Sequence, residues 1–157
     1  MAEQGFTIIT GGGPGLMEAA NLGARDADAV SVGLGIDLPH EQQLNPHVDL
    51  PLDFHYFFTR KIMFVRYACA FVVCPGGFGT LDETFEAATL RQTAKIGHFP
   101  IVLFGSDYWG GLVEWLRGPV AAEGKVDAAE VDLLEVTDDP ARVVEVVSAV
   151  PRRRQGR

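Results

Sequence analysis

The feature that most constrains the fold is a regular order of short apolar runs and helical segments along the chain. The runs are rich in β-branched residues and are mostly broken by glycine, proline or aspartate, as in strands buried on both faces. Strands are expected at residues 6–10, 30–36, 70–74, 100–104 and 131–136. Helices are expected at residues 16–26, 54–68, 80–94, 107–116 and 139–149. This alternation predicts a parallel sheet that is covered by helices.

Right-handed crossovers between such strands give a Rossmann-like, doubly wound α/β fold in three layers. A chain of 157 residues suits one domain. We place that domain at residues 1–150 and expect residues 151–157 to form a basic, solvated tail. Residues 37–53 contain three prolines and little periodicity, so we expect a long loop there. Loops of that length in compact domains are often functional.

Charge and composition exclude several classes of function. The net charge of −8 argues against nucleic acid as a partner. No apolar run reaches the about 18 residues of a membrane-spanning helix, and the acidic start is unlike a signal peptide. A cytoplasmic protein without membrane contact is therefore expected. Cys69 and Cys74 are expected to be small buried residues, and no metal site is expected.

Glycine is the unusual residue, with 18 among the 157, and it gathers in two loops. The first cluster, residues 11–15, ends a strand and precedes a helix, which is where open α/β sheets bind ligands. It lacks the lysine of a P-loop and the spacing of a dinucleotide motif. The cluster is either a phosphate-binding loop, with Gly12 and Gly13 against the ligand, or a tight turn.

The second cluster, residues 75–83 with the sequence PGGFGTLDE, is more informative. Thr80 is placed to be an N-cap, and Glu83 three residues later completes a capping box. A functional interpretation is also open. The phosphate of a sugar phosphate would lie on the glycines, and Glu83 would meet the sugar near its anomeric carbon.

Positive charge for such a site is available at Arg60 and Lys61, on the expected helix at residues 54–68. The aromatic and aliphatic residues around them allow two interpretations. Either the pair is a snorkelling surface feature, or the arginine points at the site. For Arg66 on the same helix, a surface position is favoured.

Taken together, three stretches resemble the LONELY GUY family of cytokinin riboside 5′-monophosphate phosphoribohydrolases, often labelled "possible lysine decarboxylase". They are GGGPGLMEAAN at residues 11–21, FHYFFTRK at 54–61 and PGGFGTLDE at 75–83. The residue sequence of the second stretch and the sequence LRQTAKI at residues 90–96 resemble the longer bacterial branch of this family. The resemblance runs from about residue 5 to residue 147. No lysine stands in a recognisable pyridoxal phosphate setting, so the decarboxylase label finds no support.

The resemblance implies hydrolysis of a nucleoside 5′-monophosphate to free base and ribose 5-phosphate, without a cofactor. It implies that Arg60 and Glu83 are the catalytic pair. The residues expected to bind substrate are Gly12, Gly13, Met17, Glu41, Lys61, Gly76, Gly77, Phe78, Gly79 and Thr80. Within this set, Met17 and the loop with Glu41 and Asn45 are expected to form the wall around the base. The resemblance also implies a homodimer, for which the aromatic helix at residues 54–67 is the candidate interface; alternatively, its aromatic stripe packs on the sheet of its own domain.

Two other functions are compatible with parts of the sequence. One is a module of the same superfamily that binds or carries a nucleotide or the molybdenum cofactor without hydrolysis. The other is a dinucleotide-dependent oxidoreductase that uses residues 11–15 and Asp37, although it leaves residues 75–83 unexplained. Family members also carry a strand and helix before the stretch that begins here near Gly5. Their absence is expected to leave a gap in the sheet and to remove one wall of the nucleotide site.

Overall fold

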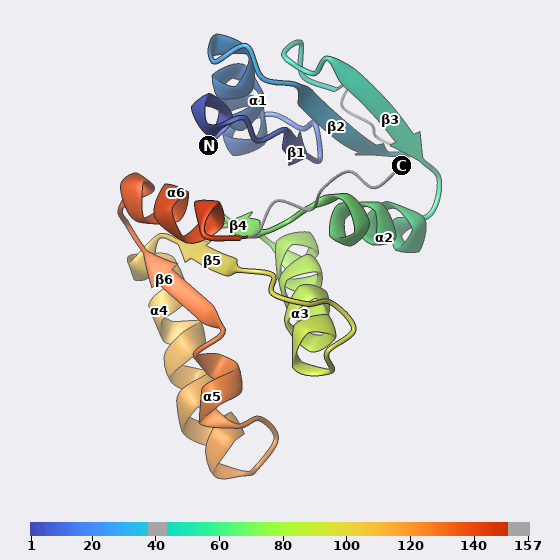
Figure 1. The fold of residues 1–157 in the computed structure, drawn as a ribbon. Helices are drawn as coiled ribbons and strands as arrows, with labels where there is room; N and C mark the ends of the chain where they lie inside the picture. The colour runs from blue at the N-terminus through green and yellow to red at the C-terminus, as the bar shows by residue number, and fades with distance from the viewer. Residues whose placement is uncertain (38–43, 151–157) are drawn as a thin grey trace. The chain divides into compact units, whose positions relative to one another are not determined.

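The computed structural model describes residues 1–37 and 44–150. The chain divides into two compact units, Met1–Ala68 and Cys69–Arg157 (Figure 1). In the first unit a short 3-10 turn is followed by β1 (Ile8–Thr10), α1 (Leu16–Asp26), β2 (Ser31–Ile36), β3 (Leu50–Phe54) and α2 (Phe57–Tyr67). The second unit contains β4 (Phe71–Val73), α3 (Phe78–Gln92), β5 (Ile101–Phe104), α4 (Ser106–Trp115), a π-type turn (Leu116–Val120), α5 (Ala128–Val131), β6 (Leu134–Thr137) and α6 (Pro140–Ser148).

The first unit is built on a parallel sheet in the order β1-β2-β3. Its central strand, β2, is buried over Ser31–Gly35, which explains its unbroken run of small and apolar residues. Thr10 aligns with Gly33 in the register of β1 and β2, and α1 packs on both strands. The first glycine loop therefore leaves the carboxyl end of β1 beside the central strand.

One strand of this sheet was not predicted. Residues 50–54 were assigned partly to a long loop and partly to a helix, but they form β3, which pairs in parallel with β2. Pro51 is tolerated because β3 is an edge strand of its sheet, where a missing backbone donor breaks no ladder. The strand is largely exposed, so its sequence lacks the apolar run of a buried strand.

The second unit has a parallel sheet in the order β4-β5-β6. Its centre is fully buried at Ile101, Val102 and Leu103. The helices α3, α4 and α6 pack on this sheet, and Trp109 on α4 is buried as a core anchor. These parallel strands with helices between them confirm the α/β, Rossmann-like class.

Helix starts test the capping predictions. Asp139 is the N-cap of α6 and accepts a hydrogen bond from the N–H of Ala141 at 2.8 Å. The expected capping box at Thr80 and Glu83 is wrong, because α3 begins at Phe78 with Gly77 as its N-cap. Glycine there leaves the helix start without a side-chain cap, and the helix begins three residues earlier than a cap at Thr80 predicts.

The cysteines also differ from expectation. Cys69 is exposed rather than buried, because the chain leaves α2 one residue earlier and runs over the surface. Cys74 is half-buried after β4, and this burial raises the pKa of its thiol. Neither forms a disulfide. Across residues 1–37 and 44–150 there is no cluster of potential metal ligands, and no helix there has the length and apolarity to span a membrane.

Candidate functional site

The first glycine loop lies under the side chain of Arg60. A methyl group in place of a Gly11 hydrogen would clash with Nη2 of Arg60, so a larger residue there would force the end of the arginine side chain to move. The Nε of Arg60 donates a hydrogen bond to the carbonyl oxygen of Leu34 at 2.7 Å. Its guanidinium carbon lies 5.3 Å from the ring centre of Phe64. Arg60 is therefore held across the loop and does not snorkel away from it.

Met17 also lies against this loop. A methyl group added at Gly13 would come within 2.5 Å of its Cε, and one added at Gly11 within 3.0 Å of its Sδ. Gly12 has a left-handed backbone with φ of 73°, and its remaining space is filled by Leu44. The structure thus brings together Gly12, Gly13, Met17 and Arg60, four of the first unit's candidate positions. Lys61 follows Arg60 on α2 and is half-buried, whereas Glu41 lies outside the described residues.

A buried polar network fixes the shape of the first loop. The amide of Asn45 donates to the carbonyl oxygens of Gly12 and Gly13, both at 3.1 Å, and to Oδ1 of Asn21 at 2.9 Å. Asn21 is fully buried and also receives the hydroxyl of Thr10 at 2.7 Å. Asn45 was expected on the wall of the base; here it is a support of the loop.

The second glycine loop ends β4 and starts α3. The N–H of Leu81 makes the first helical bond, to Gly77, so the N–H groups of Phe78, Gly79 and Thr80 have no partner within the helix. No acidic side chain lies in this first turn. The ring of Phe78 is 92% exposed, and its backbone N–H is one of the three groups at the helix start. The amino-terminal end of α3 is therefore a favourable position for an anion.

Glu83 lies in the second turn of α3 and is half-buried. It comes four residues after Gly79 and three after Thr80, so the three share one face of the helix. The structure therefore puts a carboxylate one turn below the N–H groups that favour an anion. That separation suits a ligand with a phosphate at one end and a group that becomes positive further along.

Sequence reasoning missed the residues that support this second loop. The hydroxyl of Tyr108 on α4 donates to the carbonyl oxygen of Gly76 at 2.5 Å. The start of α4 is fixed by Asp138, which accepts hydrogen bonds from Oγ of Ser106 at 2.5 Å and from its N–H at 2.7 Å. These two bonds hold the pKa of Asp138 below its usual value, and the bond from the Ser106 hydroxyl has the larger effect.

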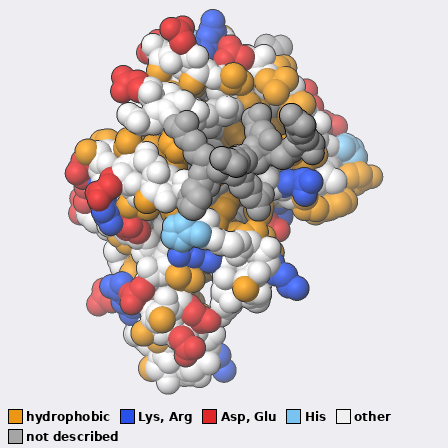
Figure 2. Space-filling view, in the orientation of Figure 1, with side chains coloured by type: hydrophobic (Ala, Val, Ile, Leu, Met, Phe, Trp, Pro, Cys, Tyr) orange, Lys and Arg blue, Asp and Glu red, His pale blue; other side chains and the backbone are white. Residues whose placement is uncertain are grey.

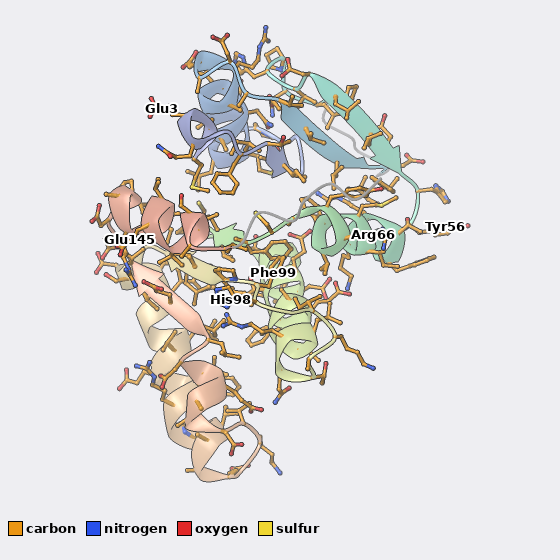
Figure 3. All side chains as sticks on the ribbon, viewed as in Figure 1. Glu3, Tyr56, Arg66, His98, Phe99 and Glu145 are labelled. Atoms are coloured by element: carbon orange, nitrogen blue, oxygen red, sulfur yellow. The ribbon has the colours of Figure 1, made fainter. Side chains whose placement is uncertain are left out.

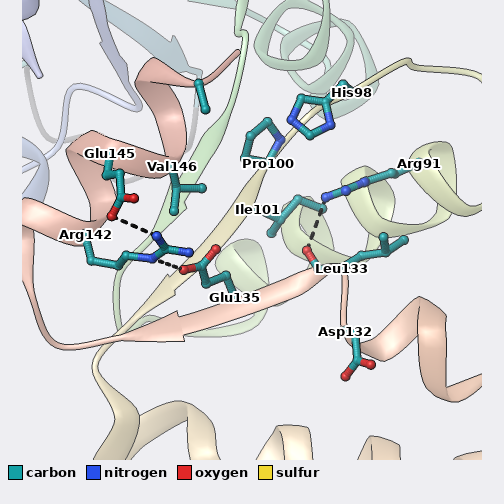
Figure 4. A pocket seen from close by; sticks show the side chains of 11 residues that line it. Arg91, His98, Pro100, Ile101, Asp132, Leu133, Glu135, Arg142, Glu145 and Val146 are labelled. Carbon is teal, nitrogen blue, oxygen red and sulfur yellow. Dashed lines mark hydrogen bonds and ion pairs between the residues drawn. The ribbon is translucent and has the colours of Figure 1, made fainter.

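The second unit also contains a cavity of about 260 Å³, shown in Figure 4. It lies beside Ile101 and Leu133, at the amino ends of β5 and β6, and so away from the glycine loop. Its charged groups serve the fold. Arg142 is paired with Glu135 at 2.6 Å and with Glu145 at 2.8 Å, and Arg91 donates to two backbone carbonyls. Partial burial lowers the pKa of Arg91.

Each unit thus carries its own group of candidate residues at the carboxyl end of its strands. Arg60 belongs to the first unit and Glu83 to the second.

Comparison with known proteins adds an independent line of evidence. The sequence model of a family described as "Possible lysine decarboxylase" matches residues 17–147. The cytokinin riboside 5′-monophosphate phosphoribohydrolase of Mycobacterium tuberculosis is 33% identical over 144 residues, which cover 88% of this chain and 75% of that protein. Its namesake in Mycobacterium marinum is 29% identical over 141 residues, with 88% and 75% covered.

Two solved structures share the fold. The molybdenum cofactor binding protein of Rippkaea orientalis has a TM-score of 0.65 at 20% identity, covering 95% of this chain and 80% of that one. The molybdenum cofactor carrier protein of Chlamydomonas reinhardtii has a TM-score of 0.64 at 24% identity, covering 95% and 79%. At these identities the likeness shows the fold alone.

Proposed function

The chain belongs to the LONELY GUY family, and from this premise we propose that it hydrolyses the N-glycosidic bond of a nucleoside 5′-monophosphate. The products are the free base and ribose 5-phosphate, and the substrate is a cytokinin riboside monophosphate or AMP. The observation that carries the proposal is the start of α3. It offers the N–H groups of a glycine-rich turn with Glu83 one turn further on the same face.

The chemistry follows from the charges. The 5′-phosphate binds the N–H groups of residues 77–80, which leaves the ribose near the carboxylate of Glu83. As the bond from C1′ to nitrogen breaks, its electron pair leaves with the base and the sugar becomes oxocarbenium-like. The carboxylate stabilises that positive charge and orients the attacking water. The water oxygen bonds to C1′, and its released proton balances the charge of the departing base.

Arg60 is the second catalytic residue of the proposal. Its guanidinium is anchored through Nε to Leu34 and lies across the first glycine loop, so its other nitrogens keep a fixed direction. A guanidinium of this kind binds ribose hydroxyls or the phosphate through two parallel donors. Gly12, Gly13, Met17 and Lys61 complete the substrate-binding set in the first unit.

Arg60→Lys is expected to lower kcat/KM about 100-fold, since an ammonium reproduces neither the Nε hydrogen bond nor the planar fork. The measurement is steady-state release of ribose 5-phosphate from AMP. Arg66→Lys is the matched control on the same exposed helix and is expected to keep the wild-type rate. Equal rates for both variants would remove Arg60 from the mechanism.

The direct test of the function is incubation of the protein with AMP and with isopentenyladenosine monophosphate, followed by an assay for ribose 5-phosphate and free base. Stoichiometric release of both products supports the proposal. Tight nucleotide binding without product after long incubation with concentrated enzyme would instead favour the non-catalytic carrier function. The likeness to the two molybdenum cofactor proteins concerns the fold and does not favour that function over hydrolysis.

We also propose that the protein forms a homodimer through α2. Hydrophobic side chains gather over this helix in Figure 2, and Tyr56 extends away from it in Figure 3. The aromatic surface consists of Tyr56, Phe57, Phe58 and Ile62, each more than half exposed. Exposed apolar groups at this density are typical of an interface.

Phe58→Glu is expected to convert the dimer to a monomer, because it places a charge in the centre of the aromatic surface. Light scattering coupled to size-exclusion chromatography measures the mass of wild type and variant. Phe78→Glu, at an even more exposed phenylalanine outside α2, is the control and is expected to leave the mass unchanged. A monomeric wild-type protein would refute the dimer.

A further inference from the structure

The second glycine loop is aligned by a tyrosine from a different helix. The hydroxyl of Tyr108 donates to the carbonyl oxygen of Gly76 at 2.5 Å, across 32 residues of sequence. The Gly76 carbonyl and the Gly77 N–H belong to one planar trans peptide and point in opposite directions. A hydrogen bond that fixes the carbonyl therefore also fixes the direction of the Gly77 N–H.

This peptide needs an external support. Gly76 and Gly77 are the two residues with the widest backbone freedom in the loop. Thr80 limits Gly76 from one side, because its Oγ1 occupies the position that a Cβ would take. Beyond this packing, the Tyr108 hydroxyl supplies a directed bond to the Gly76–Gly77 peptide.

Tyr108 is itself held in place from two sides. Its ring meets the ring of Trp109 edge-on at 4.8 Å, and Trp109 is only 1% exposed. The first turn of α4 is fixed by the two hydrogen bonds from Ser106 to Asp138. Gly105, with φ of 109°, lets the helix start against Pro75, whose ring would lie 3.5 Å from a Cβ at this position. The loops after β4, β5 and β6 thus hold one another in the second unit.

We propose that Tyr108 is a positioning residue for the substrate phosphate, acting through the Gly76–Gly77 peptide. This inference rests on the proposed function, because it assigns the phosphate of the substrate to the start of α3. Tyr108 makes the protein prefer nucleoside monophosphates to the corresponding nucleosides. Its contribution to the stability of the fold is small, since the side chain is half exposed.

The test is Tyr108→Phe, which removes the hydroxyl and keeps the ring. Calorimetric titration with ribose 5-phosphate, AMP and adenosine compares the variant with wild type. Binding of the two phosphates is expected to weaken about fivefold to tenfold, the effect of one hydrogen bond, while adenosine binding is unchanged. In turnover of AMP, KM rises by the same factor and kcat changes little. Tyr67→Phe removes a hydroxyl from another exposed tyrosine and is expected to change none of these values.

The outcomes separate the two proposals. If wild type binds ribose 5-phosphate but releases no product from AMP, hydrolysis is refuted while the titrations still decide the role of Tyr108. Unchanged phosphate affinity in Tyr108→Phe would overturn the inference, as would equal losses for adenosine and AMP, because these indicate general damage. A wild-type protein that binds neither phosphate overturns both.

Discussion

Glu83→Gln is expected to lower release of ribose 5-phosphate from AMP by at least about 1,000-fold, with nucleotide affinity nearly unchanged. The amide keeps the size of the side chain and its ability to accept a hydrogen bond. It loses the negative charge that stabilises the oxocarbenium-like transition state, an effect of about 4 kcal/mol in a shielded site. The measurement is single-turnover product release with enzyme in excess, and nucleotide affinity is read from titration.

The control for this variant is Glu114→Gln, an exposed glutamate on α4 of the same unit. It is expected to keep the wild-type rate. Both variants are expected to keep the wild-type melting temperature within about 2 degrees, because neither creates a cavity in the core. A wild-type rate in Glu83→Gln would show that the carboxylate takes no part in the reaction. Loss of both rate and stability would indicate structural damage instead.

The strand-and-helix order was predictable because buried parallel strands carry their signal locally. The apolar run at β5 predicts a buried strand, and the glycines that follow β1 and β4 indicate where those strands end. The edge strand β3 carried no such signal, since four of its five residues are exposed and Pro51 occurs in it. The start of α3 was misjudged by two residues because glycine caps a helix with its backbone and leaves no side-chain signature.

The site was predictable only where neighbouring residues define it. The glycine loops and Glu83 are short motifs, and each is found on the elements expected to hold it. Their supports come from far along the chain: Asn45 reaches Gly12 over 33 residues, and Tyr108 reaches Gly76 over 32. Hydrogen bonds between residues so far apart in sequence depend on which strands become neighbours in the sheet. A single sequence does not reveal that strand order.

The largest effect on stability is expected from Asn21→Leu. Asn21 is fully buried, and its side chain joins the hydroxyls of Thr10 and Ser31 and the amide of Asn45. Leucine has the same branched shape but offers no hydrogen bond, so the hydroxyls of Thr10 and Ser31 and the amide of Asn45 each lose a partner. Each unsatisfied group costs about 1–3 kcal/mol. With partial relaxation, we expect the free energy of unfolding to fall by about 3 kcal/mol.

Chemical denaturation followed by far-UV circular dichroism measures this loss. Asn21→Leu combined with Ser31→Ala is the sharper comparison, because it removes one of the stranded hydroxyls together with its former partner. The double variant is expected to be about 1 kcal/mol more stable than Asn21→Leu alone, since a buried polar pair replaced by apolar groups leaves no unmet hydrogen bond. A double variant that is less stable than Asn21→Leu would show that the network is not the source of the effect. Asn45 keeps its own hydrogen bonds to the carbonyl oxygens of Gly12 and Gly13 but loses the one to Asn21 that helps to orient its amide, so substrate affinity is expected to fall together with stability.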